Sequence, residues 1–303
     1  MKVLVTGLAG FAGTHLGRLL EKSGFPPLPL ALAGRRVDIT DAEAVSRAIA
    51  ETRPDRVYHL AAIAGIARSW RERGTTFAVN VEGTRNLVSA LLEHAPDCRL
   101  LLVSTGNLYG EPGPEGRPFT ESDPPRPLDP YSESKLEAER VCREAFDQRG
   151  LDIRIARPLG HTGPGQKRQN VVPEFASQVA EVLLNKREPV IRVGNLEVWR
   201  EFGDVRDMVR GYQLVMEAGE PGGIYNLATN EPRSIREVLE TLMRIAGVNA
   251  RLEPDPERLR PSDYSTASLD TERIAALGFS FRIPFEKTLA DVFAEQLERA
   301  RNS

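Results

Sequence analysis

The sequence has little cysteine and little excess charge. Only Cys98 and Cys142 occur among 303 residues, which is too few for a disulfide framework or a cysteine-based metal cluster. We therefore predict no metal site and two buried packing thiols. The 40 basic and 43 acidic residues leave a net charge of -3, which does not indicate a nucleic-acid or membrane-surface partner. Any site for an anion has to be built locally.

Long hydrophobic segments are also missing. No uncharged apolar run reaches about 18 residues, the length that a membrane span requires, and the apolar run after Met1 is shorter than that of a signal peptide. We therefore expect a soluble cytoplasmic protein. Apolar residues make up 41% of the chain and charged residues 27%, a balance typical of folded globular proteins. The length allows one large domain or two associated domains.

Short apolar segments alternate with segments of helical periodicity in the first half of the chain. This alternation predicts an α/β fold, with a doubly wound parallel sheet that has helices on both faces. The predicted strands span residues 3–5, 28–32, 56–62, 100–104, 151–156 and 224–227, and the predicted helices span 14–22, 41–51, 75–93, 132–146, 235–246 and 286–299.

The alternation ends near Arg157. Gly160, Gly163, Pro164 and Gly165 follow within a few residues, and such a stretch does not predict regular structure. A smaller, mixed α/β C-terminal domain is expected to start here, and the chain is expected to return to the sheet at its last predicted strand. The predicted domains are 1–160 with 201–228, and 161–200 with 229–303.

A glycine-rich loop, Gly7-Leu-Ala-Gly10-Phe-Ala-Gly13, lies directly after the first predicted strand and opens the first predicted helix. This is the context that a dinucleotide-binding loop requires. Glycine permits a tight turn and a close approach of the backbone to a pyrophosphate, and the start of the helix offers unpaired N–H groups to the phosphates. The loop predicts a bound NAD or NADP.

The choice between NAD and NADP stays open from the sequence. An acidic residue that binds the ribose 2′-hydroxyl is usual about 20 residues after the glycines, but the chain has Arg35 and Arg36 near this place. The two arginines are compatible with a 2′-phosphate or with an ordinary exposed turn. Asp38 and Ile39 are predicted to contact the adenine end of the cofactor.

Tyr131 and Lys135 are four residues apart at the start of a predicted helix, so both side chains lie on one face. A phenol with an ordinary pKa near 10 is a poor acid or base at neutral pH, and we predict that the neighbouring ammonium lowers the pKa of Tyr131. Thr105 ends a buried strand, where catalytic groups gather in open α/β sheets. These three residues are predicted to form the catalytic group.

Together with these residues, His59-Leu60-Ala61-Ala62, Asn80-Val-Glu-Gly-Thr84 and Asp129-Pro-Tyr131 resemble the extended short-chain dehydrogenase/reductases, or NAD-dependent epimerases/dehydratases, that act on nucleotide sugars. The resemblance covers the whole chain and implies an NAD(P)-binding Rossmann fold. It implies Thr105, Tyr131 and Lys135 as the catalytic trio. The residues implied to bind the cofactor are Gly7, Gly10, Phe11, Ala12, Asp38, Ile39, Leu60, Ala61, Ala62, Asn80, Tyr131, Lys135 and Pro158.

The second half of the chain is most similar to the branch of GDP-4-keto-6-deoxy-D-mannose reductases and GDP-mannose 4,6-dehydratases. The similar segments span residues 157–166, 193–196, 200–207 and 259–263. They imply a nucleotide-diphosphate sugar as substrate, with arginine forks on the diphosphate. The residues implied to bind this substrate are Thr105, Asn107, Asn195, Arg200, Arg260 and Asp263.

Besides the missing acidic residue after the second predicted strand, two positions depart from that branch. Asn107 stands where the dehydratases carry an acidic residue and where the most similar reductases tend to keep a glutamate, so the identity of the substrate stays open. An amide cannot act as the acid or base of a dehydration. Gly160 replaces an asparagine. We therefore expect a reductase that transfers a hydride at sugar carbon 4, with a nucleotide-sugar 4-epimerase as the alternative; a dehydratase or a non-catalytic dinucleotide sensor is less favoured.

The resemblance also implies a homodimer formed by the helices that begin near Thr75 and Ser132. Phe77, Val81, Leu87 and Val88 lie on the first of these helices, and the sequence assigns them equally to an interface or to the core.

Overall fold

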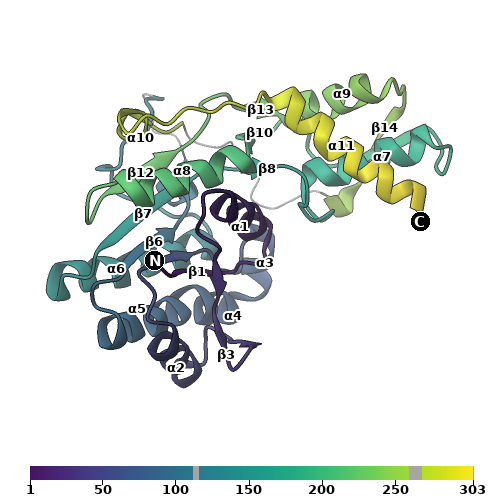
Figure 1. Ribbon diagram of the computed structural model, residues 1–303. Coiled ribbons are helices and arrows are strands. Elements are labelled where there is room, and N and C mark those ends of the chain that lie inside the picture. The colour runs from purple at the N-terminus through teal and green to yellow at the C-terminus, as the bar shows by residue number, and fades with distance from the viewer. Residues whose placement is uncertain (112–115, 259–267, 303) are drawn as a thin grey trace. The chain divides into compact units, whose positions relative to one another are not determined.

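The computed structural model describes residues 1–111, 116–258 and 268–302, which form two compact units (Figure 1). The first unit comprises Met1–Leu159, Met208–Leu227 and Ala267–Phe279, and the second comprises Gly160–Asp207, Ala228–Thr266 and Ser280–Ser303. Within the described part of the chain, no helix combines the length and the apolar character that crossing a membrane would need.

The boundaries of these units differ at two places from those expected from the sequence. The first unit resumes at Met208 and not at residue 201, because Asp204 is held in the second unit by a hydrogen bond of 2.7 Å from the Thr288 hydroxyl. Leu269 was expected in the C-terminal domain but belongs to the first unit, where it forms a β-bridge with Phe119.

A six-stranded sheet forms the centre of the first unit. All five strand pairs in it are parallel, and the strand order is β12-β7-β6-β5-β1-β2. The strands are β1 (Val3–Thr6), β2 (Leu28–Pro29), β5 (Arg56–His59), β6 (Arg99–Val103), β7 (Ile153–Pro158) and β12 (Ile224–Leu227). The order reverses between β1 and β5, which confirms the doubly wound Rossmann topology and places a crevice for a ligand at the carboxyl ends of these two strands.

Helices cover both faces of this sheet (Figure 1). The layer formed by α2, α5 and α6 buries apolar side chains of all three helices against the strands, among them Ile49, Leu91 and Cys142. The helical elements are α1 (Phe11–Lys22), α2 (Ala42–Thr52), α3 (Ile66–Arg71), α4 (Arg73–Phe77), the π-helical turn η1 (Ala78–Glu82), α5 (Gly83–His94), the 3-10 turn η2 (Gly106–Tyr109), α6 (Pro130–Arg149), α8 (Val205–Ala218) and α10 (Glu272–Ala276). Both cysteines are buried, as predicted.

The predicted strand at 28–32 is shorter in the structure. Only Leu28 and Pro29 pair with β1, because a proline has no N–H to donate to a further ladder. The chain then forms a separate hairpin of β3 (Ala31–Leu32) and β4 (Arg35–Arg36). This hairpin carries Arg35 and Arg36 beside the carboxyl end of β2.

The predicted helix at 75–93 is divided into α4, η1 and α5. Such a π-helical turn carries an extra residue, and these turns are frequent at functional sites. Val81, Leu87 and Val88 are buried in the core of the first unit, and Phe77 packs against that core. These apolar positions therefore serve the interior of the unit.

The second unit is a mixed α/β structure with its own core. Its strands form three two-stranded sheets: β8 (His161–Thr162) with β11 (Gly203–Asp204), β9 (Val190–Val193) with β14 (Arg251–Pro254), and β10 (Trp199–Arg200) with β13 (Arg233–Ser234). Its helices are α7 (Val171–Leu183), α9 (Ile235–Ala246), η3 (Pro256–Arg258) and α11 (Phe285–Asn302). Phe175, Leu239 and Val292 bring the three long helices together. Ser234 caps α9 as part of a capping box with Glu237, and the predicted helix at 235–246 is confirmed.

Candidate active site

The glycine loop has the local geometry that a dinucleotide cradle needs. Gly7 adopts a φ of +73°, and a Cβ at this position would lie 2.8 Å from the Ala61 backbone nitrogen. The Gly10 N–H donates to the Gly7 carbonyl over 2.8 Å and precedes α1, which has no side-chain cap at Gly10. The first N–H groups of α1 are thus available to an anion.

This loop forms one wall of a pocket of about 550 Å³. The residues that line it come from the ends of β1, β2 and β5 and from the hairpin, and they are Val5, Thr6, Gly7, Leu8, Ala9, Gly10, Pro29, Leu30, Arg36, Val37, Asp38, Ile39 and Ala61. Its mostly apolar walls beside a glycine turn fit the adenosine and pyrophosphate of NAD or NADP. Five of the residues predicted to bind the cofactor therefore meet here: Gly7, Gly10, Asp38, Ile39 and Ala61.

Asp38 and Arg36 are the charged residues among those that line the pocket. The Asp38 carboxylate accepts hydrogen bonds from the N–H and the hydroxyl of Thr40 at 3.0 and 2.8 Å, and these bonds lower its pKa. Leu30, the residue after β2, is apolar, whereas Arg36 is exposed and lines the pocket. The pocket thus offers a guanidinium at its rim.

Thr105, Tyr131 and Lys135 all belong to the first unit. Thr105 is buried just after β6, and its side chain lowers the pKa of the Tyr131 phenol. Tyr131 and Lys135 lie in the first two turns of α6, which begins with Pro130 and is capped by Asp129. The Asp129 carboxylate accepts from the N–H and the hydroxyl of Ser132, both at 2.9 Å. The cap fixes where the helix starts and so where the phenol lies.

Burial dominates the titration of both groups on α6. It raises the pKa of Tyr131 to about 12, while the Thr105 side chain acts in the opposite direction. It lowers the pKa of Lys135 to about 8, against the charge of Glu139, which raises it. The predicted lowering of the Tyr131 pKa by Lys135 is therefore wrong for the polypeptide itself. The structure provides a phenol that keeps its proton at neutral pH.

Asn80 is predicted to bind the cofactor, but in the structure its side chain forms hydrogen bonds to other residues of the first unit. The buried amide accepts from the Ile63 N–H at 2.8 Å and donates to the Ile63 carbonyl and the Ser134 hydroxyl at 3.1 and 2.9 Å. The Ser134 hydroxyl donates in turn to the Tyr131 carbonyl at 2.7 Å. Asn80 therefore links the π-helical turn to the first turn of α6.

His59 lies at the end of β5 and is fully enclosed. Its Nδ1 and Nε2 atoms are 2.7 and 2.9 Å from the hydroxyls of Thr6 and Thr84. Burial lowers its pKa to about 3, and the charge of Lys135 contributes to the shift. A neutral imidazole thus joins β1 to α5, a role that its family segment in the sequence did not indicate.

The remaining predicted residues are distributed over both units. In the first unit, Phe11 and Ala12 open α1, Leu60 and Ala62 follow β5, Pro158 ends β7 and Asn107 lies in η2. In the second unit, Asn195 Oδ1 accepts from the Glu197 N–H at 3.0 Å, and Arg200 donates to the Trp199 carbonyl at 3.0 Å. Arg260 and Asp263 lie outside the described residues.

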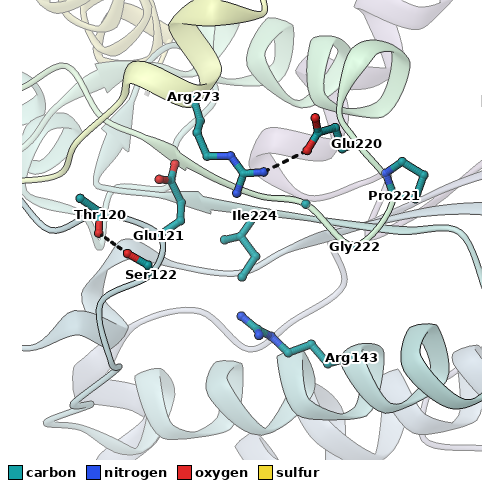
Figure 2. Close-up of a pocket in the computed structure, with 10 residues that line it drawn as sticks. Thr120, Glu121, Ser122, Arg143, Glu220, Pro221, Gly222, Ile224 and Arg273 are labelled. Carbon is teal, nitrogen blue, oxygen red and sulfur yellow. Dashed lines mark hydrogen bonds and ion pairs between the residues drawn. The ribbon is translucent and has the colours of Figure 1, made fainter.

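The first unit has a second pocket, of about 390 Å³, which Figure 2 shows. Arg143 from α6 and Arg273 from α10 extend toward it, and Glu121 and Glu220 stand beside them. Arg273 is ion-paired with Glu220 at 3.4 Å and lies over the ring of Tyr225. Two guanidinium groups are thus matched by two carboxylates, and none of the predicted catalytic residues lines this pocket.

Residues 3–228 match the NAD dependent epimerase/dehydratase family. The chain belongs to this family. GDP-6-deoxy-D-mannose reductase from Pseudomonas aeruginosa is 31% identical over 301 residues, which cover 99% of this chain and 98% of the relative. dTDP-glucose 4,6-dehydratase from Streptomyces griseus is 32% identical over 315 residues, which cover 96% and 93%. The resemblance seen in the sequence is thereby confirmed, including its branch.

Solved structures give the same assignment. RMD from Pseudomonas aeruginosa in complex with NADPH superimposes with a TM-score of 0.90 at 30% identity, covering 99% of this chain and 100% of that one. UDP-glucose 4-epimerase from Thermus thermophilus in complex with NAD gives a TM-score of 0.86 at 30% identity, covering 98% and 99%. Structural relatives in the family thus use either NAD or NADPH, as the sequence predicted for the family.

Proposed function

We propose that this chain is an NAD(P)H-dependent nucleotide-sugar 4-ketoreductase, with GDP-4-keto-6-deoxy-D-mannose as its substrate. The observation that carries the proposal is the placement of Tyr131 and Lys135 on one face of α6, with the buried Thr105 side chain acting on the Tyr131 phenol, in a chain that matches a GDP-6-deoxy-D-mannose reductase from end to end. Asn107 argues against a dehydratase, because its amide cannot remove or supply the protons of a dehydration.

A bound nicotinamide cofactor would supply the hydride for sugar carbon 4. The phenol of Tyr131 is protonated at neutral pH and can deliver its proton to the carbonyl oxygen at that carbon. The side chain of Thr105 acts on the phenol and lowers its pKa, and its hydroxyl can share the charge that develops on the oxygen. By resemblance, the ammonium of Lys135 would hold the nicotinamide ribose. The substrate gains one hydride and one proton and becomes an alcohol.

The experiment that tests this function follows the loss of NADPH and NADH absorbance with enzymatically prepared GDP-4-keto-6-deoxy-D-mannose. Oxidation of either cofactor supports the ketoreductase, and the absence of oxidation contradicts it. The likeness to a UDP-glucose 4-epimerase makes a 4-epimerase the second candidate. An epimerase would retain NAD through desalting and would interconvert UDP-glucose and UDP-galactose without a net change in absorbance.

The arrangement of the hairpin leads to a prediction about the cofactor. Arg36 lines the pocket, whereas Arg35, its neighbour in β4, does not. We expect Arg36→Ala to raise the KM for NADPH about 10- to 100-fold, because a charge-assisted hydrogen bond to the 2′-phosphate is lost. The KM for NADH should change less than threefold. Arg35→Ala is the matched control, and equal losses for both cofactors in Arg36→Ala would contradict this preference for NADP.

The pKa of Lys135 predicts how the rate depends on pH. If the ammonium is the active form, kcat/KM stays level near pH 7 and falls as the pH rises through about 8, where Lys135 loses its proton. Tyr131, with a pKa of about 12, remains protonated over this range. A profile measured from pH 6 to 10, with circular dichroism to exclude unfolding, tests this. A plateau that extends to pH 10 would assign no role to the charge of Lys135.

The oligomeric state and the compartment belong to the same proposal. We infer a homodimer through the helices that begin near Thr75 and Ser132, supported by the family resemblance. Light scattering after size exclusion tests this state. We also infer a cytoplasmic location, supported by the low cysteine content and the nucleotide-sugar substrate.

A further inference from the structure

A buried ion pair lies one helical turn beyond Lys135. The Arg157 guanidinium donates from Nε to Glu139 Oε1 at 3.0 Å and from Nη2 to Glu139 Oε2 at 2.7 Å, and both side chains are 1% exposed. Removing two charges from water carries a large desolvation cost, so a buried pair is weak evidence for a role in stability. Its place in the first unit indicates a different role.

Glu139 shares a face of α6 with the two catalytic residues. Tyr131, Lys135 and Glu139 are spaced four residues apart, so their side chains follow one another along the helix. The Glu139 carboxylate raises the pKa of Lys135 and opposes the effect of burial. The buried Cys142 thiol also acts on Lys135, and Lys135 in turn helps to lower the pKa of the buried His59. Glu139 is thus the carboxylate that supports the charge of Lys135 in the described part of the chain.

Arg157 connects this carboxylate to the segment that carries Thr105. Its Nη1 donates to the Tyr109 hydroxyl at 2.6 Å, and its guanidinium lies 5.0 Å from the centre of the Tyr109 ring. The Tyr109 hydroxyl donates to Asn226 Oδ1 at 2.8 Å. Because Tyr109 ends the 3-10 turn that Thr105 caps, a single guanidinium ties α6 to the loop after β6.

We propose that Glu139 and Arg157 are positioning residues for the reaction. Glu139 keeps Lys135 in its charged form, and Arg157 fixes both the Glu139 carboxylate and the Tyr109 ring, so that the Thr105 hydroxyl stays aligned with the Tyr131 phenol. This inference rests on the proposed function for its catalytic readout. The part that concerns Lys135 can also be measured through cofactor binding alone.

Glu139→Gln removes the charge and keeps the size of the side chain. We expect the alkaline limb of the kcat/KM profile to move down by about one pH unit, because Lys135 loses a nearby opposite charge. The pH at which NADPH affinity falls, followed by NADPH fluorescence, should move by the same amount. Glu139→Asp keeps a carboxylate and should return the alkaline limbs of both profiles, kcat/KM and NADPH affinity, toward those of the wild type. Glu144→Gln removes an exposed charge from the same helix and should leave both limbs in place.

Arg157→Lys separates the two parts of the proposal. It keeps a positive charge beside Glu139 but loses the fork that reaches Tyr109. We expect the alkaline limb to stay near that of the wild type while kcat falls about tenfold, since small misalignments of reacting groups are costly. The KM for NADPH should change little in this variant.

A lowered melting temperature in Glu139→Gln, with no change in the pH dependence of kcat/KM or of NADPH affinity, would overturn the proposal. The ion pair would then be a purely structural feature. Should that variant fail to fold, the double variant Glu139→Gln/Arg157→Gln leaves neither charge buried alone. Its alkaline limb should also move down, by less than in the single variant, because the positive charge of Arg157 is lost as well. If the wild type does not oxidise NADPH with the sugar, the proposed function fails. The pH dependence of NADPH binding then decides the role of Glu139 by itself.

Discussion

Replacing Tyr131 by phenylalanine is expected to lower kcat for NADPH oxidation by about 10²- to 10⁴-fold, the usual contribution of a positioned proton donor. The ring would keep its place in the first turn of α6, whose start is set by the Asp129 cap and not by the phenol. The loss is therefore chemical. The affinity for NADPH should remain within about threefold of the wild type, because Tyr131 is not among the residues that line the pocket beside the glycine loop.

Two measurements separate this loss from a folding defect. NADPH binding is followed by fluorescence titration, and turnover is followed by loss of absorbance with the 4-keto sugar. Tyr225→Phe is the matched control in the same unit, because its hydroxyl only accepts a bond of 2.8 Å from the Glu220 N–H. Turnover of Tyr131→Phe close to that of Tyr225→Phe would remove Tyr131 from the catalytic group.

The features that depend only on residues close together in the sequence were predicted. The glycine loop, the four-residue spacing of Tyr131 and Lys135, and the place of Thr105 at a strand end depend only on one strand and the residues that follow it. A parallel sheet then brings the carboxyl ends of its strands to one edge. This is why the doubly wound topology, and the presence of Thr105 and Tyr131 in the same unit, could be expected from the sequence.

Features that depend on distant partners were missed. Glu139 and Arg157 are 18 residues apart, and nothing in either segment indicates that the other will be its buried partner. The π-helical turn that presents Asn80 interrupts a helix whose periodicity is continuous in the sequence. The pKa of Tyr131 was predicted in the wrong direction, because burial depends on packing that sequence spacing does not report.

The second large effect is expected at Gly13. A Cβ there would overlap the Gly7 carbonyl oxygen and would lie 2.9 Å from the Leu8 Cα. Both neighbours are backbone atoms of the glycine loop, so relief requires the loop itself to move. We expect Gly13→Ala to weaken NADPH binding about 100-fold and to lower the free energy of unfolding by about 2–4 kcal/mol.

Gly17→Ala provides the matched control on the same helix. A Cβ at Gly17 would meet the end of the flexible Leu8 side chain at 3.0 Å, and alanine is a better helix former by about 1 kcal/mol. The cost of the close contact with Leu8 and the gain in helix propensity nearly cancel. The free energy of unfolding and the NADPH affinity should therefore stay close to those of the wild type. Isothermal titration with NADPH and chemical denaturation measure both. If the two alanines weaken binding equally, the approach of α1 to the glycine loop does not shape the pocket; if only Gly13→Ala does, the third glycine of the motif acts by keeping the Gly7 carbonyl in place.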